Sequence, residues 1–297
     1  MTIDSSVSPK RFYQSLKEKS PLIPLSRRHP FVYLERCKIV RKDNDVVVFS
    51  EVHQEAFALP VGSIGALLLG PGVSLSSESA RIIVSRGCLI NITGGESMPV
   101  YLISNQHRSP LPRLRQHRVV FDPQLRQKGG ITLFQFRSEF VRKHCPAGFP
   151  EFSGFSDQDS IEVLLAKEGA WAKRAYAFAS KYYSVNWMGK AEARGNAHPI
   201  VFLNHLSYSI ADLAILHLGF DPNIGILHGR TRGGGLCYDL ADIIKPLLAL
   251  CDSFDAIKNE KSMTDMKKFF LERVVELDLI DVMIKCLNSI FASESED

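Results

Sequence analysis

Residues 161–183 read IEVLLAKEGAWAKRAYAFASKYY, and apolar side chains recur in this stretch every three or four positions. This spacing is that of one helix face, so the stretch predicts an α-helix whose apolar face packs inward. The face comprises Ile161, Leu165, Glu168, Ala172, Ala175, Ala179 and Tyr182. Glu168 is the exception, because a buried carboxylate is costly unless a cation or a hydrogen-bond donor meets it. Glu168 is therefore either a metal ligand or the partner of a buried lysine or arginine.

A second stretch, NIGILHGRTRGGGLCYDLADIIK at residues 223–245, supplies further candidate ligands. His228 closes an apolar run, a glycine-rich loop follows, and a predicted helix then carries Asp239 and Asp242 three residues apart on one face. One histidine with two or three carboxylates favours Mg²⁺ or Mn²⁺ over Zn²⁺. Two alternatives remain open, since Asp239 could cap its helix and His228 could be a buried core histidine.

The amino-acid composition limits the classes of protein to which this chain can belong. The chain has 297 residues, of which 45% are hydrophobic and 23% charged, so it has enough apolar material for two globular domains. We expect no membrane span, because no apolar run is long enough, and no signal peptide, because the first eight residues are polar. The six cysteines form no CxxC pair, which argues against a zinc ribbon or a disulfide framework and favours a cytoplasmic location.

Hydrophobic patterning predicts an α+β protein with a β-rich domain followed by an all-α domain. Strands are predicted near residues 31–40, 46–49, 56–60, 65–70, 88–92 and 100–103, with one helix at 76–86. Helices are predicted at 113–128, 131–143, 159–183, 198–218, 238–254, 264–277 and 280–291, with Gly129-Gly130 as a break and Pro246 as a kink. The predicted domains are an N-terminal arm (1–29), a β-rich domain (30–104), a basic linker (105–125) and an α-helical domain (126–297).

Positive charge is unevenly distributed along the chain. The net charge is +4, yet residues 104–145 alone hold nine arginines and lysines against two acidic residues. The residues before Pro30 add a further basic excess. Clustered arginine is typical of proteins that contact a phosphate backbone, although a solvated helix face or an arginine-rich interface has the same composition.

Several separated motifs, in a fixed order, resemble the CRISPR-associated adaptation integrases of the Cas-one (Cas1) family. In the N-terminal half these motifs are residues 59–64 (LPVGSI), 69–72 (LGPG), 76–86 and 94–95. In the C-terminal half they are Glu168-Gly169 ahead of a tyrosine-bearing helix, residues 225–228 (GILH) and residues 238–245 (YDLADIIK). The resemblance runs from about Phe31 to the last helices. Residues 228–235 look most like the type I-F branch, with the I-E branch also close.

The resemblance implies both a site and a reaction. It implies that Glu168, His228 and Asp242 are the metal ligands and catalytic residues, and that Asp239 is a supporting carboxylate. The ion would be Mg²⁺ or Mn²⁺. The reaction it implies is insertion of prespacer DNA into a CRISPR repeat, in which each 3′-hydroxyl attacks one phosphodiester of the repeat.

It also implies partners. These are prespacer DNA and the CRISPR repeat and leader, a second copy of the chain bound through the β-rich domain, and the adaptation partner Cas-two, which in type I-F systems is usually fused to Cas-three. Arg230 and Arg232 in the glycine-rich loop, and Lys245 one turn past Asp242, are candidates for DNA contact. The basic linker matches the family poorly, so no individual contact is assigned within it.

Three other functions fit parts of the same pattern. A stand-alone metal-dependent endonuclease acting on branched or repair DNA would need an identical site. A DNA-binding scaffold without catalysis would need only the basic clusters, but it would leave the three candidate ligands without a purpose. A phosphatase-like hydrolase is disfavoured by the arginine clusters.

Overall fold

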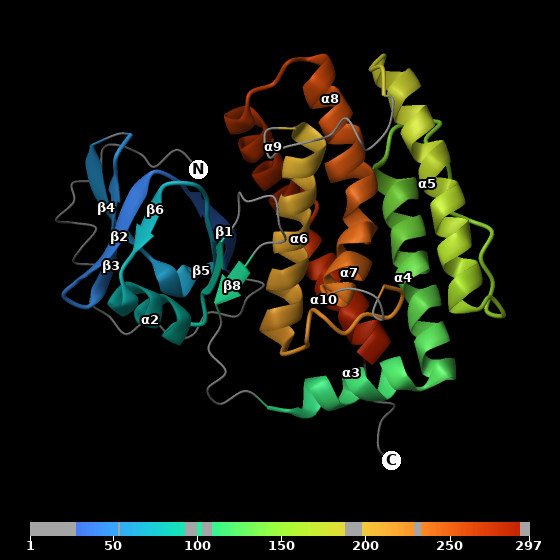
Figure 1. Cartoon of the computed structure of the whole chain (residues 1–297), viewed down its shortest axis with the longest axis horizontal. Coiled ribbons are helices and arrows are strands. Elements are labelled where there is room, and N and C mark those ends of the chain that lie inside the picture. The colour runs from blue at the N-terminus through green and yellow to red at the C-terminus, as the bar shows by residue number, and fades with distance from the viewer. Residues whose placement is uncertain are drawn as a thin grey trace. The chain divides into compact units, whose positions relative to one another are not determined.

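The computed structural model describes residues 28–52, 54–92, 100–102, 109–187, 198–228 and 233–291. It is an α+β protein, as the sequence predicts, with strands in the N-terminal part and helices in the C-terminal part (Figure 1). The described residues divide into two compact units, one ending with the last strand and the other beginning at residue 109. Most of the N-terminal arm, the Gly94-Gly95 motif and both loop arginines, Arg230 and Arg232, lie outside the described residues.

The described residues of the first unit form two four-stranded sheets and one helix. One sheet has the order β1 (His29–Leu34), β5 (Ile64–Leu69), β7 (Leu89–Ile92), β8 (Val100–Leu102). The other has the order β4 (Glu55–Leu59), β3 (Asp45–Ser50), β2 (Cys37–Lys42), β6 (Val73–Leu75). Helix α2 (Ser77–Ser85) begins after Ser76, whose hydroxyl accepts a hydrogen bond from the Ser79 amide as an N-cap does.

The single strand predicted at residues 31–40 is wrong. The chain forms two strands there, and they belong to different sheets: β1 pairs in parallel with β5, whereas β2 pairs antiparallel with β3. Arg36 lies between them with a φ of 46°, which turns the chain out of the extended conformation. The charged pair Glu35-Arg36 lies at this turn, but the stretch has no glycine, proline or asparagine that would predict a turn there.

Strand β5 is buried along its whole length, between β1 and β7. The apolar run Ala66–Leu69 therefore packs inside the unit, as expected for an interior parallel strand. This run is buried within one copy of the chain, so its apolar character does not require a second copy. Dimerisation through this unit remains a prediction.

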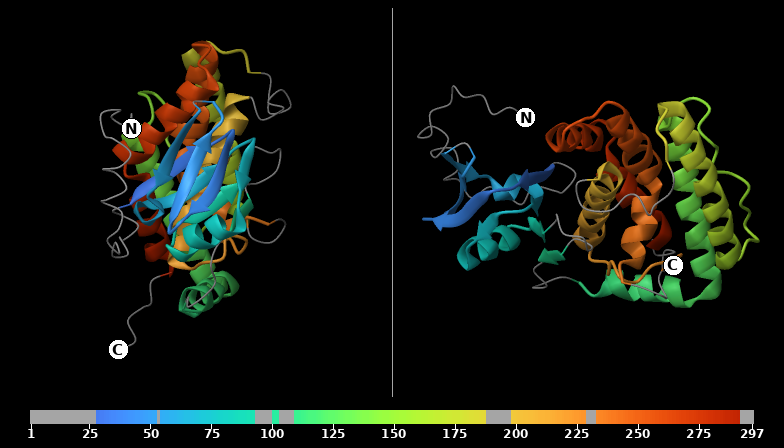
Figure 2. Two further views of the ribbon diagram at one scale, coloured as in Figure 1. Left: turned by 90° about the vertical axis from the view of Figure 1, so that its left-hand side faces the viewer. Right: turned by 45° about the horizontal axis from the view of Figure 1, so that its top comes forward.

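The second unit is built from helices packed around α6 (Pro199–Leu218). The others are α3 (Leu111–Phe121), α4 (Pro123–His144), α5 (Ile161–Tyr183), α7 (Gly235–Lys245), the π-helix η3 (Pro246–Cys251), α8 (Asp252–Lys258), α9 (Met263–Glu276) and α10 (Leu279–Phe291). Helices α4 and α5 run side by side in Figure 1 and in the right-hand view of Figure 2. By length and composition α6 could cross a bilayer, but two thirds of its most apolar window is buried, as in the core helix of a globular domain.

The predicted helix break at Gly129-Gly130 is also wrong. The break falls earlier, where the Asp122 carboxylate accepts hydrogen bonds from the amides of Gln124 and Leu125 and Pro123 occupies the first helical position. Both glycines lie inside α4. A Cβ atom on Gly129 would come within 3.1 Å of Ile226, so glycine there allows α4 to approach the segment that carries His228.

Pro246 marks a change of helix type. The predicted helix over residues 238–254 is observed as α7, η3 and α8 in direct succession, with the proline at the first position of the π-helix. A π segment accommodates the missing amide of proline without ending the helix.

Asp212 makes the stability of the helical unit depend on pH. Its side chain lies within α6 and is 2% exposed, and its Oδ1 has no partner among the described residues. Burial, only partly offset by the Cys237 thiol, raises the pKa of Asp212 to about 7. The folded state therefore holds this proton more tightly than the unfolded state, and the associated stability is lost as the pH rises from about 4 to about 7.

We expect the Asp212→Asn variant not to lose this stability as the pH rises. Its free energy of unfolding, relative to the wild type, should rise by about 2–4 kcal/mol between pH 4 and pH 8. Urea unfolding followed by tryptophan fluorescence measures this difference, because both tryptophans, Trp171 and Trp187, belong to the helical unit. A difference that does not vary with pH would contradict the prediction.

Candidate metal centre

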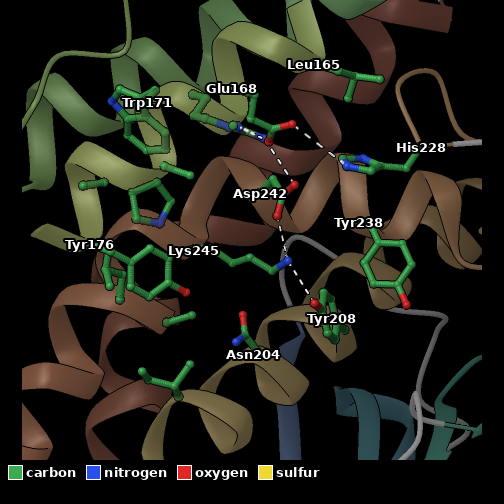
Figure 3. A pocket seen from close by; sticks show the side chains of 18 of the residues that line it. Leu165, Glu168, Trp171, Tyr176, Asn204, Tyr208, His228, Tyr238, Asp242 and Lys245 are labelled. Carbon is green, nitrogen blue, oxygen red and sulfur yellow. Dashed lines mark hydrogen bonds and ion pairs between the residues drawn. The ribbon is translucent and has the colours of Figure 1, made fainter. Parts of the chain in front are cut away.

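Glu168, His228 and Asp242 meet at one point of the helical unit. Each offers one ligand atom, and the three atoms lie within 4.8 Å of one another (Figure 3). Glu168 comes from the middle of α5, His228 from the segment after α6, and Asp242 from α7. The structure thus brings together the three residues that the sequence singles out, across 74 positions of the chain.

The polar face of this site opens into a cavity of about 600 Å³. The predicted stripe on α5 faces two ways. Ala179 is buried away from the cavity, whereas Leu165, Glu168, Ala172 and the buried Ala175 line it. Aromatic side chains form much of the remaining wall, with Trp187, Tyr176 and Tyr208 among them (Figure 3). Glu168 is therefore at the edge of a cavity and not inside close packing, which makes it accessible to an ion or a substrate.

Arg137 on α4 lies between two of the three candidate ligands. Its guanidinium donates to Glu168 Oε1 at 2.5 Å and approaches Asp242 Oδ2 at 3.4 Å, and the residue is only 2% exposed. The alternative for Glu168, a partnership with a buried arginine, is thus correct, and it coexists with membership of the cluster. One carboxylate oxygen faces Arg137, and the other faces His228 Nε2 at 4.0 Å.

Arg137 was missed as a site residue because it was counted with the basic cluster of residues 104–145. A signal was present. Arg137 occupies the buried face of α4 with Phe134, Phe140 and Val141, at the same helical spacing that singles out Glu168 on α5. A charged residue within an apolar stripe on each of two helices predicts an ion pair between them.

Asp242 is strongly stabilised in its ionised form. Burial opposes its ionisation, but the charges of Lys245 and Arg137 outweigh burial and lower the pKa of Asp242 to about 2. Lys245 Nζ donates to Asp242 Oδ1 at 2.7 Å and to the Tyr208 hydroxyl at 3.0 Å. Lys245 is therefore a neighbour of the candidate ligands, and its contact with DNA remains a prediction.

Asp239 holds the histidine in place. Its carboxylate is fully buried and accepts hydrogen bonds from the backbone amides of Ile226, Leu227 and His228. Its Oδ1 also lies 2.7 Å from His228 Nδ1. This contact raises the pKa of His228, against the effect of burial. The alternative of Asp239 as a helix cap is wrong, because Gly234 is the N-cap of α7 and Asp239 binds the amides of a preceding segment.

The same contact fixes the tautomer of the neutral histidine. When Nδ1–H donates to Asp239, the lone pair of Nε2 points toward Glu168 and is free to bind a metal, which is a common arrangement for metal-binding histidines. His228 is partly exposed at the cavity and is not the buried core histidine of the alternative reading.

The donor set fits a divalent cation. Glu168 uses one oxygen for Arg137, whereas Asp242 faces Lys245 with Oδ1 and, at the longer distance of 3.4 Å, Arg137 with Oδ2. Both carboxylates lie with His228 within reach of a common point. With His228 neutral, three carboxylates (Glu168, Asp239, Asp242) face two permanent cations (Arg137, Lys245), so the cluster keeps an excess of negative charge. Two carboxylates with one imidazole suit Mg²⁺ or Mn²⁺, and the imidazole favours Mn²⁺.

The basic cluster of residues 104–145 is only partly a surface feature. Arg137 is buried, and Arg126 donates from Nε to the Ile226 carbonyl at 2.7 Å. The exposed members among the described residues are Arg113, Arg115, Arg118, Lys128, Arg142 and Lys143. Those six side chains are the ones available for a phosphate backbone.

Asp239 provides a direct test of how the histidine is held. We expect Asp239→Asn to lower the free energy of unfolding by about 3 kcal/mol, because the amide NH₂ would face backbone donors that now bind a charged acceptor. It should also lower the pKa of His228, since the contact with Asp239 is the main cause of its elevation. Urea unfolding and NMR titration of the imidazole measure the two effects, and exposed Asp157→Asn is the control. An unchanged pKa of His228 would contradict the arrangement.

Comparison with known proteins identifies relatives of this chain. Residues 151–269 match the family model described as CRISPR associated protein Cas1. The CRISPR-associated endonuclease Cas1 of Pectobacterium atrosepticum is 24% identical over 309 aligned positions, covering 91% of this chain and 94% of that protein. The protein of the same description from Escherichia coli K12 is 27% identical over 231 positions, covering 75% and 71%.

Solved structures share the fold. The crystal structure of the TtCas1–DNA complex has a TM-score of 0.73 at 23% identity and covers 90% of this chain and 93% of that chain. A casposase bound to its integration product has a TM-score of 0.62 at 13% identity, with 90% and 92% covered. At these identities the likeness shows the fold alone. In each comparison the strands and helices of the solved structure correspond to those of this chain over 90% of its length.

Proposed function

We propose that this chain, a member of the Cas1 family, is a metal-dependent DNA endonuclease and integrase that inserts prespacer DNA into a CRISPR repeat. The observation that carries the proposal is the convergence of Glu168, His228 and Asp242 beside an open cavity. Relatives named as endonucleases, and a relative crystallised with DNA, support the substrate class.

The reaction we propose is a transesterification. A 3′-hydroxyl oxygen of the prespacer forms a bond to a phosphorus of the repeat, and the bond from that phosphorus to its 3′ oxygen breaks. The displaced oxygen keeps the electron pair and takes up a proton from solvent as the attacking hydroxyl releases one. A bound Mg²⁺ or Mn²⁺ would supply Lewis-acid stabilisation of the charge at the attacked phosphate.

The chain's own residues have separate parts in this scheme. Glu168, His228 and Asp242 would hold the ion, and Asp239 keeps Nε2 of His228 available. Arg137 and Lys245 orient the two carboxylates. The aromatic wall of the cavity, with Tyr176 and Trp187 stacked at 5.6 Å, offers flat apolar surfaces against which unpaired bases of a DNA end can pack.

The finer features of the proposal rest on sequence resemblance. These are the type I-F branch, a homodimer formed through the β-rich unit, and the partner Cas-two either separate or fused to Cas-three. A cytoplasmic location is proposed from the six scattered cysteines. The pattern of residues 228–235 supports the branch. Arg230 and Arg232 are proposed DNA contacts because they follow His228 in the sequence, and Lys245 because it contacts Asp242.

Removal of the metal should abolish the reaction. We expect the protein, with its Cas-two partner, to join a labelled 3′-hydroxyl duplex to a supercoiled repeat plasmid in Mn²⁺ or Mg²⁺, and to lose this activity completely in excess EDTA. Gel analysis of labelled plasmid measures joining, and a gel-shift assay in EDTA serves as the binding control.

The same assay separates the rival functions. Cutting of linear or branched DNA without joining would indicate a stand-alone endonuclease, which the names of the relatives also favour. Binding of DNA with neither cutting nor joining, in any metal, would indicate a scaffold and would contradict the proposal.

A further inference from the structure

The segment that carries His228 has no regular structure of its own. Residues 220–228 link the end of α6 to the candidate metal centre and form no helix or strand. Few backbone groups of this segment pair within it, the Ile224 amide with the Asp221 carbonyl at 3.3 Å being one such pair, and the Pro222 carbonyl accepts from the Leu236 amide at the start of α7 at 2.9 Å. Side chains from neighbouring helices pair several of the other backbone groups. The identity of those side chains decides how firmly His228 is held.

Gln116 on α3 makes the first of these contacts. Its side chain is 0% exposed, on a helix whose arginines face solvent. Its Nε2 donates to the carbonyls of Asp221 and Ile224, each at 2.7 Å, and its Oε1 accepts from the Asp221 amide at 2.8 Å. The side-chain amide of Gln116 thus donates both of its hydrogen bonds to, and accepts one from, backbone groups of a single turn.

The contacts continue in order along the segment. Arg126 on α4 donates to the Ile226 carbonyl, and Asp239 on α7 then accepts from the amides of residues 226–228. Gly225 lies between these contacts, against the start of α7, where a Cβ atom would come within 2.4 Å of the Gly235 carbonyl carbon. Three helices therefore fix the backbone from residue 221 to His228 at successive points.

We propose that Gln116 is a positioning residue for the candidate metal centre. It touches neither the candidate ligands nor the cavity, and it acts by fixing the turn from which the chain runs to His228. The inference rests on the proposed function, since it assumes that His228 binds the ion with Glu168 and Asp242. Displacement of a ligand by about 1 Å is enough to weaken such a site strongly.

A glutamine of the same kind elsewhere provides a matched control. Gln127 on α4 also donates from Nε2 to two backbone carbonyls, those of Asp157 and Asp159, at 3.1 and 3.0 Å. Those carbonyls belong to the segment before α5 and not to the segment of His228. If the role of Gln116 were only to satisfy buried backbone groups, Gln116→Met and Gln127→Met would affect metal binding equally.

The experiment compares these two variants of the full-length protein with the wild type. Isothermal titration measures Mn²⁺ affinity, and hydrogen exchange read by mass spectrometry measures protection of residues 221–228. We expect Gln116→Met to reduce Mn²⁺ affinity by about 10- to 100-fold, the effect usual for groups that orient metal ligands. Exchange at residues 221–228 should be faster in that variant. Gln127→Met should leave both measurements within about twofold of the wild type.

Each other outcome has a definite meaning. Unchanged exchange in Gln116→Met, or faster exchange with unchanged Mn²⁺ affinity, would overturn the positioning role. Wild-type protein whose Mn²⁺ binding is absent, or survives His228→Ala, would overturn the proposed function, while the exchange rates would still decide whether Gln116 fixes the segment. If Gln116→Met does not fold, Gln116→Glu, which keeps the shape but loses both donors, is compared with Gln127→Glu.

Discussion

The Glu168→Gln variant is expected to lose strand joining and cutting by at least about 10³-fold while DNA affinity changes by no more than a few-fold. The substitution keeps the size of the side chain and the oxygen that faces Arg137, but it removes the negative charge at the atom that faces His228. A neutral amide is a weak ligand for Mg²⁺ or Mn²⁺, so we expect the substitution to slow the chemical steps of joining and cutting. We expect DNA binding to depend instead on the exposed arginines and lysines.

Rates of joining and cutting under single-turnover conditions in saturating Mn²⁺ measure the first effect, and gel-shift titration at fixed salt measures the second. Glu139→Gln is the matched control, because Glu139 is exposed on α4 and lies away from the cavity. Activity of Glu168→Gln within tenfold of the wild type would exclude a metal-bound Glu168 from the reaction. Equal loss in Glu139→Gln would point to a general effect of charge.

The three candidate ligands could be predicted from the sequence because each one disturbs a local pattern. Glu168 interrupts an apolar helix face, and His228 and Asp242 flank a glycine-rich loop over a short distance. The structure brings their ligand atoms together, while their binding of a metal remains a prediction. Asp239 was recognised only as a supporting carboxylate, because its true partners, three backbone amides, depend on how a loop folds back on α7.

Residues whose role depends on distant parts of the chain were missed. Gly129 and Gly130 have the composition of a helix break, yet their purpose is close packing against residues about 30 to 160 positions away. Gln116 looks like an ordinary polar residue of a basic helix, and only its partners, 105 and 108 positions away, reveal its contacts. Local periodicity carries no information about such pairs, so they require the tertiary structure.

Arg137 gives the largest expected effect on stability. Its guanidinium is buried with Glu168 and Asp242 and lies over the rings of Phe134 and Phe152, whose centres are 5.5 and 4.9 Å from the guanidinium carbon. Replacement by methionine fills most of the same space with an apolar side chain but leaves two partly buried carboxylates without this partner. In the absence of divalent cations we expect Arg137→Met to lower the free energy of unfolding by about 3–5 kcal/mol.

The same variant tests whether the site binds a cation at all. A guanidinium and a divalent ion neutralise the same two carboxylates, so Mn²⁺ should restore much of the stability that Arg137→Met loses. Urea unfolding followed by tryptophan fluorescence, with Mn²⁺ or with EDTA, measures this recovery, and Arg142→Met on the exposed face of α4 is the control. We expect Mn²⁺ to raise the free energy of unfolding more in Arg137→Met than in the wild type, because the variant has no fixed positive charge beside the ion's ligands. A destabilised variant that Mn²⁺ does not stabilise would mean that Arg137 completes a purely structural ion pair and that the three side chains do not form a metal site.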